Sequence, residues 1–324
     1  MYLESWKGSE YSLLEKFGLK QIRLNLPFRL NHVNCFLAEG ENGWKIIDTG
    51  LHNQETMDRW KKELAGKEVT DIILTHYHPD HFGYAGALQK KTGAHVWMSE
   101  TDEKNGKLSW EKEAIEGLEQ NYRQAGVPED ISKRMKNNTM EFIPRVTPYP
   151  TVNHYLQEKE TLVLGNNEYE IFSAPGHSDG MVVFYNRENN LLLSADQILP
   201  KITPNISYWF HGDPNPLKSY LNSLDRLSEL DAEIVVPSHG RPFYGANDRI
   251  REIQAHHDDR LNVTLELLNE GGTVYDICQK LFRKTLTVHE MRFAIGETLA
   301  HLEYLRFQGE CKREMSEKGY IYHR

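Results

Sequence analysis

The stretch Asp71-Ile72-Ile73-Leu74-Thr75-His76-Tyr77-His78-Pro79-Asp80-His81 is the most informative part of the chain. Residues 71–74 predict a short buried strand, and the six residues after Thr75 contain three imidazoles and one carboxylate. Imidazole and carboxylate together form the ligand set that divalent zinc, iron or manganese prefers. The cluster lies where a strand ends and a loop begins, which is where α/β proteins place their chemistry. The sequence therefore predicts a metal enzyme.

Three more candidate ligands each follow a predicted strand. His177 follows the strand at 168–173, Asp196 follows the strand at 191–195, and His239 follows the strand at 234–236. This shared location predicts that the candidate ligands gather at one edge of a sheet. The full set is His76, His78, Asp80, His81, His177, Asp196 and His239.

The composition indicates a globular, soluble chain, with 324 residues, 39% hydrophobic and 26% charged. The net charge of −9 argues against binding of nucleic acid or an anionic membrane by the surface as a whole. The cysteines Cys35, Cys278 and Cys311 have no CxxC spacing, so we expect no thiolate zinc site and no disulfide framework. We also expect a cytoplasmic location, no membrane segment, and a small-molecule substrate, and we leave a homodimer open.

Strands alternate with helices along most of the chain, which indicates a layered α/β arrangement. Residues 100–156 are instead polar, helix-prone and rich in proline towards the end, and we interpret them as an insertion that forms a lid. From about residue 248 we expect three helices, at 248–269, 273–283 and 287–308, followed by a short hairpin. This pattern predicts a catalytic domain over residues 1–247 and a winged-helix-like domain over residues 248–324.

The chain resembles hydrolases with the metallo-β-lactamase fold over roughly residues 20–245. The resemblance rests on the H-x-H-x-D-H run at 76–81, Pro175-Gly176-His177-Ser178, Ser194-Ala195-Asp196, Ser238-His239-Gly240 and Asp48-Thr49-Gly50. It implies an α+β fold, a four-layer αβ/βα sandwich. It also implies one metal held by His76, His78 and His177, a second held by Asp80, His81 and His239, and Asp196 between them. An aspartate at that position is similar to the glyoxalase II and lactonase branch rather than to antibiotic-degrading lactamases.

The implied chemistry is hydrolysis by a hydroxide bridged between two divalent ions, which lower the pKa of bound water from about 15.7 to about 7. We expect Zn²⁺, with Fe and Mn as alternatives. Asp80 is expected to bind metal and to move a proton, and Asp48 to orient a metal-bound histidine, unless it simply caps the helix that follows. Four residues between Asp196 and His239 could line the substrate pocket or could simply pack on the core: Tyr208, Trp209, Phe210 and His211, of which Tyr208 and His211 are the first candidates.

Two substrate classes fit this site. The first is a small ester, thioester or lactone, which a lid could enclose. The second is RNA or another phosphodiester, because a winged-helix-like module also occurs in relatives that include a mitochondrial endoribonuclease. Residues 271–324 carry nine Lys/Arg and seven Asp/Glu, so the module has a net charge of only +2, which favours packing or a dimer contact over nucleic-acid binding. A flavin-linked di-iron protein is a third alternative, ranked last because no flavodoxin-like domain follows.

Overall fold

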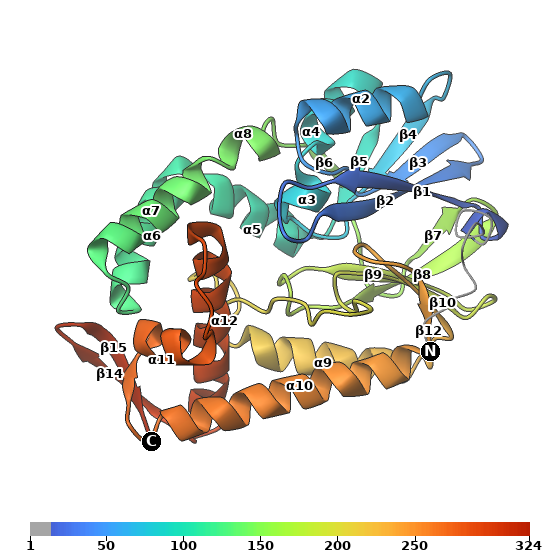
Figure 1. The fold of residues 1–324 in the computed structure, drawn as a ribbon. Helices are drawn as coiled ribbons and strands as arrows, with labels where there is room; N and C mark the ends of the chain where they lie inside the picture. The colour runs from blue at the N-terminus through green and yellow to red at the C-terminus, as the bar shows by residue number, and fades with distance from the viewer. Residues whose placement is uncertain (1–13) are drawn as a thin grey trace.

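Two six-stranded β-sheets form the centre of the computed structural model, which describes residues 14–324 (Figure 1). The first sheet has the order β1 (Leu19–Asn25), β2 (His32–Gly40), β3 (Gly43–Ile47), β4 (Val69–Ile73), β5 (His95–Met98) and β6 (Val152–Tyr155). The second has the order β12 (Phe243–Tyr244), β11 (Ile234–Pro237), β10 (Leu191–Ala195), β9 (Val182–Asn186), β8 (Asn167–Ser173) and β7 (Thr161–Leu164).

The sheets combine antiparallel edges with parallel centres. In the first sheet β3, β4, β5 and β6 pair in parallel, and in the second β10 and β11 do so. Strands such as β9 and β10 are buried along their whole length, as their unbroken runs of apolar residues predict. Parallel pairing places the carboxyl ends of β10 and β11 side by side in the second sheet.

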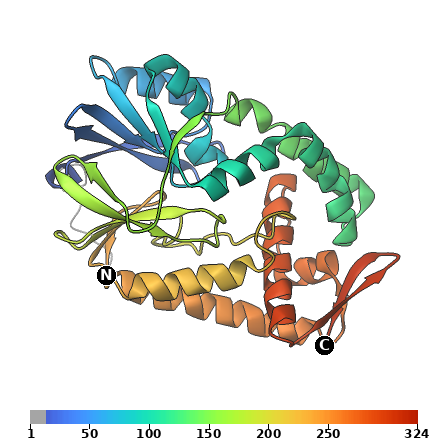
Figure 2. The ribbon, with the colours of Figure 1, turned by 180° about the vertical axis from the view of Figure 1, so that it is seen from behind.

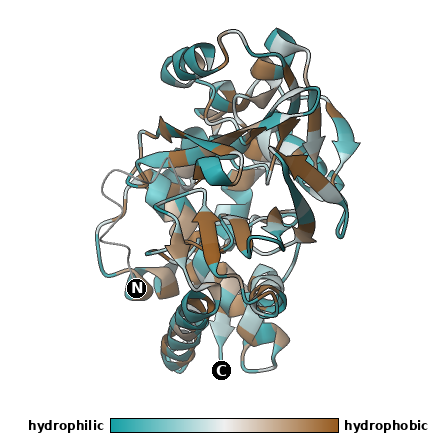
Figure 3. Ribbon diagram, turned by 90° about the vertical axis from the view of Figure 1, so that its right-hand side faces the viewer, coloured by the Kyte–Doolittle hydropathy of each residue, from teal (hydrophilic) through white to brown (hydrophobic). Residues whose placement is uncertain are grey.

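Helices cover the outer face of each sheet, which gives four layers. On the first sheet these are α2 (Gln54–Glu63) and α4 (Ala85–Thr92), whose Trp60 and Leu88 pack on the strands. Under the second sheet α9 (Pro216–Ser228) and α10 (Ala246–Leu267) run side by side in both views (Figures 1 and 2). Figure 3 shows apolar residues concentrated along the strands. The αβ/βα sandwich predicted from the sequence is confirmed.

The predicted insertion consists of four helices and then returns to the sheet. The helices are α5 (Glu100–Trp110), α6 (Lys112–Gln124), α7 (Glu129–Met140) and α8 (Ile143–Val146). The last residues of the predicted range form β6, which pairs with β5. Because β6 is a short edge strand with three of its four residues exposed, it has no buried pattern that would reveal it in the sequence.

The C-terminal helices and hairpin share a core with the second sheet. They comprise α11 (Val274–Leu281), α12 (Val288–Phe307), and a three-stranded sheet of β13 (Gly272–Thr273), β15 (Gly319–His323) and β14 (Lys312–Ser316). One continuous apolar cluster joins Ala174 beside the second sheet, Tyr220 on α9, Ile295 on α12 and Tyr322 on β15. The module therefore packs against the sandwich through this shared core. The domain boundary at residue 247 remains a prediction.

Short polar signals set the start of these helices. Thr273 with Asp276, and Thr287 with Glu290, form capping boxes at the starts of α11 and α12. Across the described part of the chain, no helix has the length and apolar character needed to cross a membrane.

Candidate metal centre

The seven candidate ligands come together at the ends of strands from both sheets. His76 and His78 lie in the loop after β4, and Asp80 and His81 lie on the one-turn helix α3 (Pro79–Phe82). The other three follow strands of the second sheet: His177 follows β8, Asp196 follows β10, and His239 follows β11. All seven side chains belong to three overlapping groups of three residues. Within each group, the ligand atoms lie within 4.8 Å of one another.

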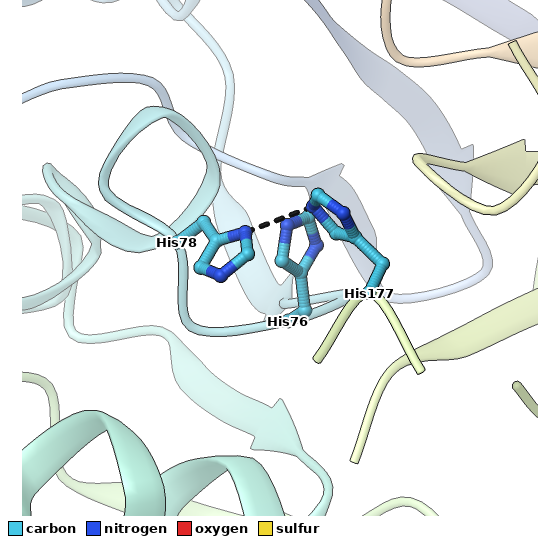
Figure 4. Close-up of side chains that lie close together, drawn as sticks. All are labelled: His76, His78 and His177. Carbon is cyan, nitrogen blue, oxygen red and sulfur yellow. Dashed lines mark hydrogen bonds between the residues drawn. The ribbon is translucent and has the colours of Figure 1, made fainter. Parts of the chain in front are cut away.

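The first group consists of His76, His78 and His177, whose rings face one another in Figure 4. His78 Nδ1 lies 2.9 Å from His177 Nε2, and the His76 and His177 ring centroids are 5.1 Å apart. These two nitrogens are within hydrogen-bond distance here, and a divalent cation could take the place of the proton between them. This arrangement could hold one divalent ion.

The second group consists of Asp80, His81 and His239, and Asp196 lies between the two groups. Asp196 Oδ2 is 3.5 Å from His177 Nε2 and 3.2 Å from His239 Nε2, while its Oδ1 is 3.5 Å from His81 Nε2. Asp80 Oδ2 is 3.4 Å from His239 Nε2. One carboxylate therefore touches ligands of both groups.

The hydrogen bonding of the histidines fits a divalent metal. Buried nitrogens with no hydrogen-bond partner include Nε2 of His76, His81 and His239, and Asp196 Oδ1 is in the same condition. The opposite ring nitrogen of His81 faces an Asp48 oxygen at 2.8 Å, and that of His239 faces the His32 carbonyl at 2.6 Å. A proton held on the outer nitrogen leaves the inner one free to bind metal. Burying so many polar atoms without partners is costly unless a cation joins them.

The pKa shifts in the cluster show at which groups a proton would compete with a metal ion. Although burial opposes it, contact with Asp196 and Asp80 raises the pKa of His239 to about 10 and that of His81 well above its usual value. Burial lowers the pKa of His76, and nearby histidines lower it further. Against the effect of burial, His81 and His239 lower the pKa of Asp80 to about 2, so Asp80 is a carboxylate at neutral pH.

Asp48 holds the metal loop rather than capping the helix that follows it. Its carboxylate accepts hydrogen bonds from the Thr75 backbone N–H at 2.9 Å and from the Thr75 hydroxyl at 2.9 Å, and it also contacts His81 Nδ1. The start of α2 is capped instead by Asn53, whose side chain accepts from the Thr56 N–H. Asp48 therefore contacts the candidate metal ligand His81 from the side away from the other ligands, as expected from the sequence.

Asp102, on the first turn of α5, ties together two ligand loops that the sequence did not connect. Its buried carboxylate accepts from the Tyr77 N–H at 3.2 Å, the Ser178 hydroxyl at 2.6 Å and the Gly180 N–H at 2.6 Å. Burial raises the pKa of Asp102 to about 7 against the effect of these donors. In the sequence Asp102 is one of three acidic residues among four, Glu100 to Glu103, so no local pattern distinguishes it.

Of the four aromatic-segment residues before α9, Trp209 is the one that contacts a candidate metal ligand. Trp209 lies edge-on to His78, with centroids 6.0 Å apart. Tyr208 packs against Phe210, and its backbone N–H bonds to an α12 carbonyl, whereas His211 Nε2 lies 2.9 Å from the Ser109 hydroxyl on α5. Phe210 has a left-handed φ of 64°, so the backbone changes direction between Trp209 and His211. Substrate contact by Tyr208 and His211, and catalysis by Asp80, remain predictions.

Sequence comparison gives a direct family match. The family described as "Metallo-beta-lactamase superfamily" matches residues 29–239, and "Metallo-beta-lactamase-like, C-terminal domain" matches residues 261–324. The chain belongs to the metallo-β-lactamase superfamily. As in that superfamily, the protein is a metal-dependent hydrolase.

Individual relatives of this metallo-β-lactamase superfamily member cover both parts of the chain. It is 26% identical to the probable metallo-hydrolase YqjP of Bacillus subtilis over 88% of this chain and 91% of YqjP. It is 27% identical to the hydroxyacylglutathione hydrolase GloC of Haemophilus influenzae over 53% of this chain and 69% of GloC. The crystal structure of a metallo-beta-lactamase family protein from Thermus thermophilus matches with a TM-score of 0.83 and 33% identity, covering 95% of this chain and 98% of that one.

Proposed function

We propose that this protein hydrolyses a small ester, thioester or lactone with two divalent ions, Zn²⁺ in the first instance. One ion would be held by His76, His78 and His177, the other by Asp80, His81 and His239. The observation that supports two ions is the position of Asp196, within 3.5 Å of histidines from both groups. Such ions, when bound, supply an activated water and polarise the oxygen of the bond under attack.

The chain's own side chains would supply orientation and proton transfer. Among the carboxylates at the centre, Asp80 is the most exposed, with 20% of its side-chain surface accessible. It is ionised at neutral pH. It can therefore accept a proton from a reacting group and pass it to solvent. Asp48 and Asp102 would hold the ligand loops, and Trp209 would keep water from the side beside His78.

The preference for a small substrate rests on the surroundings of the centre. The face of α12 towards the insertion carries His289 and Phe293, which pack among aromatic rings of the insertion and the loop before α9 and so leave this side of the centre largely apolar. The name of the relative GloC specifies an acylated glutathione, which supports the thioester class. Homodimer formation is a separate proposal, for which size-exclusion chromatography with light scattering is the measurement.

Metal analysis and a substrate panel together test the proposed function. We expect two equivalents of metal per chain and hydrolysis of at least one ester, thioester or lactone. His76→Ala and Asp196→Ala should lose metal and activity while the exposed His95→Ala control keeps both. A fully metal-loaded protein that cleaves short RNA faster than any small ester would show that the phosphodiester alternative is right.

A further inference from the structure

Two guanidinium groups lie close to the metal centre without a carboxylate partner. Within residues 14–324, no carboxylate is within ion-pair distance of Arg145 on α8 or Arg292 on α12. Arg292 donates a 3.4 Å hydrogen bond to the Asn138 amide oxygen, and its Nε has no partner although the residue is only 6% exposed. Nearby, by contrast, Arg29 pairs with Glu290 at 3.4 Å.

Both guanidinium groups border one stack of aromatic rings. Arg145 Cζ lies 5.1 Å from the Phe142 ring centroid, and Arg292 Cζ lies 5.7 Å from it. His289 stacks on Phe142 with centroids 5.4 Å apart, and on Phe28 with centroids 4.9 Å apart. Three separate segments contribute to this stack: the β1–β2 loop, the insertion, and the first turn of α12.

The stack adjoins the metal centre from two directions. On one side the rings of His289, Phe293, Trp209 and His78 are in sequential contact, with centroid separations of 5.0, 5.8 and 6.0 Å. On the other side the backbone of α8 rests on the metal-binding helix: a Cβ added at Gly83 would lie 2.4 Å from the Arg145 carbonyl oxygen. The guanidinium groups therefore flank the approach to the centre.

A buried cation without a counter-charge is costly to keep. Removing a guanidinium from water is compensated only if an anion or several acceptors meet it. Arg292 is such a group, and the half-buried Arg145 lies beside the same ring, in a chain whose net charge is −9. A planar guanidinium fork fits carboxylate and phosphate oxygens, and aromatic rings beside it favour an apolar group on the same ligand.

We propose that Arg145 and Arg292 bind an oxyanion of the substrate, a carboxylate or phosphate, while the half-buried Phe28, supported from behind by Phe142, packs on an adjoining apolar or aromatic group. This inference rests on the proposed hydrolytic function and narrows it. The substrate is then an anionic ester or thioester, with the charged group on the side of the scissile bond that faces α12. Neutral esters would be poor substrates at the same centre.

A matched set of aryl esters tests this inference. The probes are 3-acetoxybenzoate, 3-acetoxyphenyl phosphate and the neutral, nearly isosteric 3-acetoxybenzamide. We expect metal-loaded wild-type protein to favour one of the anions by at least about tenfold in kcat/KM, and Arg145→Met to bring this ratio close to one. Arg145→Lys should keep part of the preference. The exposed Arg283→Met, on the same module, should leave it unchanged.

Binding provides a readout that does not depend on turnover. The affinity of metal-loaded protein for 3-hydroxybenzoate and for 3-hydroxybenzamide can be measured by calorimetry in wild type and Arg145→Met. A carboxylate preference that disappears in Arg145→Met supports the subsite even if no ester is hydrolysed, an outcome that would reject the proposed function alone. Equal treatment of charged and neutral probes by wild type, or an unchanged ratio in Arg145→Met, would reject the subsite.

Discussion

Asp48→Asn should weaken metal binding through the tautomer of one histidine. In the wild type, one Asp48 oxygen faces His81 Nδ1 at 2.8 Å, so the ring proton resides on Nδ1 and Nε2 is free for metal. An amide nitrogen in place of that oxygen would donate to Nδ1 and move the ring proton to Nε2, the ligand atom. Asn suits this test because Asp48 has φ = 56°, a left-handed conformation that Asn tolerates and most other residues do not.

The size of the effect follows from the bonds that change. A hydrogen bond to a charged group contributes about 1.5–3 kcal/mol, and loss of such a partner behind a metal ligand usually lowers metal affinity by about 10- to 100-fold. The contacts from Thr75 should survive in part, because the retained amide oxygen can still accept from its backbone N–H. We therefore expect weaker metal binding at the site that contains His81, and only a small change in folding.

Competition with a chromophoric chelator measures this affinity, and circular dichroism checks the fold. The matched control is Asp231→Asn, which also replaces a carboxylate at a positive φ, 46°, but lies at an exposed turn before β11, at the opposite end of that strand from His239. Zinc affinity in Asp48→Asn within twofold of wild type would show that the carboxylate does not set the tautomer of His81.

Four further outcomes follow from contacts around the centre. Without metal, His239, whose pKa is raised to about 10, and His81, whose pKa is also raised, are both protonated at pH 7. Zinc binding should therefore release protons and become tighter as pH rises. Calorimetry in buffers of different ionisation enthalpy measures this proton release. In metal-free protein the stabilisation from protonated His239 should be complete below about pH 6.5 and lost as pH rises through about 10, as followed by denaturant unfolding. Gly83→Ala should lower both melting temperature and metal affinity, since its Cβ would meet the Arg145 carbonyl at 2.4 Å, whereas Gly117→Ala, with open space around it, should not. Glu297→Leu should weaken zinc binding severalfold. Glu297→Gln should retain most of the affinity, because its amide oxygen can still accept the hydrogen bond from the Asn205 side chain. Equal losses of zinc affinity in both variants would point to a general packing effect.

The strands, the main helices and the ligand clusters could be predicted because each leaves a local signal. Asp196 and His239 follow the largely apolar strands β10 and β11, which pair in parallel, and His177 follows β8, an alternating strand separated from β10 by the antiparallel β9, so the three strands end on the same side of the sheet. Asp102 could not be assigned in this way, and nor could Trp209 be singled out from its neighbours Tyr208, Phe210 and His211. Their contacts depend on how the insertion and the loop before α9 pack, and a single acidic residue or tryptophan carries no information about distant partners.

The C-terminal module reaches the metal centre through hydrogen bonds that no sequence pattern signals. The backbone carbonyl of Asn205 faces His177 Nδ1 at 2.8 Å, and the Asn205 side chain donates to Glu297 on α12 at 3.0 Å. Next to this contact, Gly296 lets α12 approach Ser207 so closely that a Cβ there would lie 2.6 Å from the hydroxyl oxygen. The orientation of a candidate metal ligand therefore depends on a helix more than 100 residues away in sequence.

This connection changes what the module can be expected to do. A tethered binding domain could be removed without affecting the centre, but removing α12 would take away Glu297 and expose the apolar core that the module shares with α9 and the second sheet. The same helix presents Arg292 and Phe293 beside the aromatic stack. Metal retention and the choice of substrate are thus coupled to one element, so variants of α12 that keep the fold should alter both together rather than either alone.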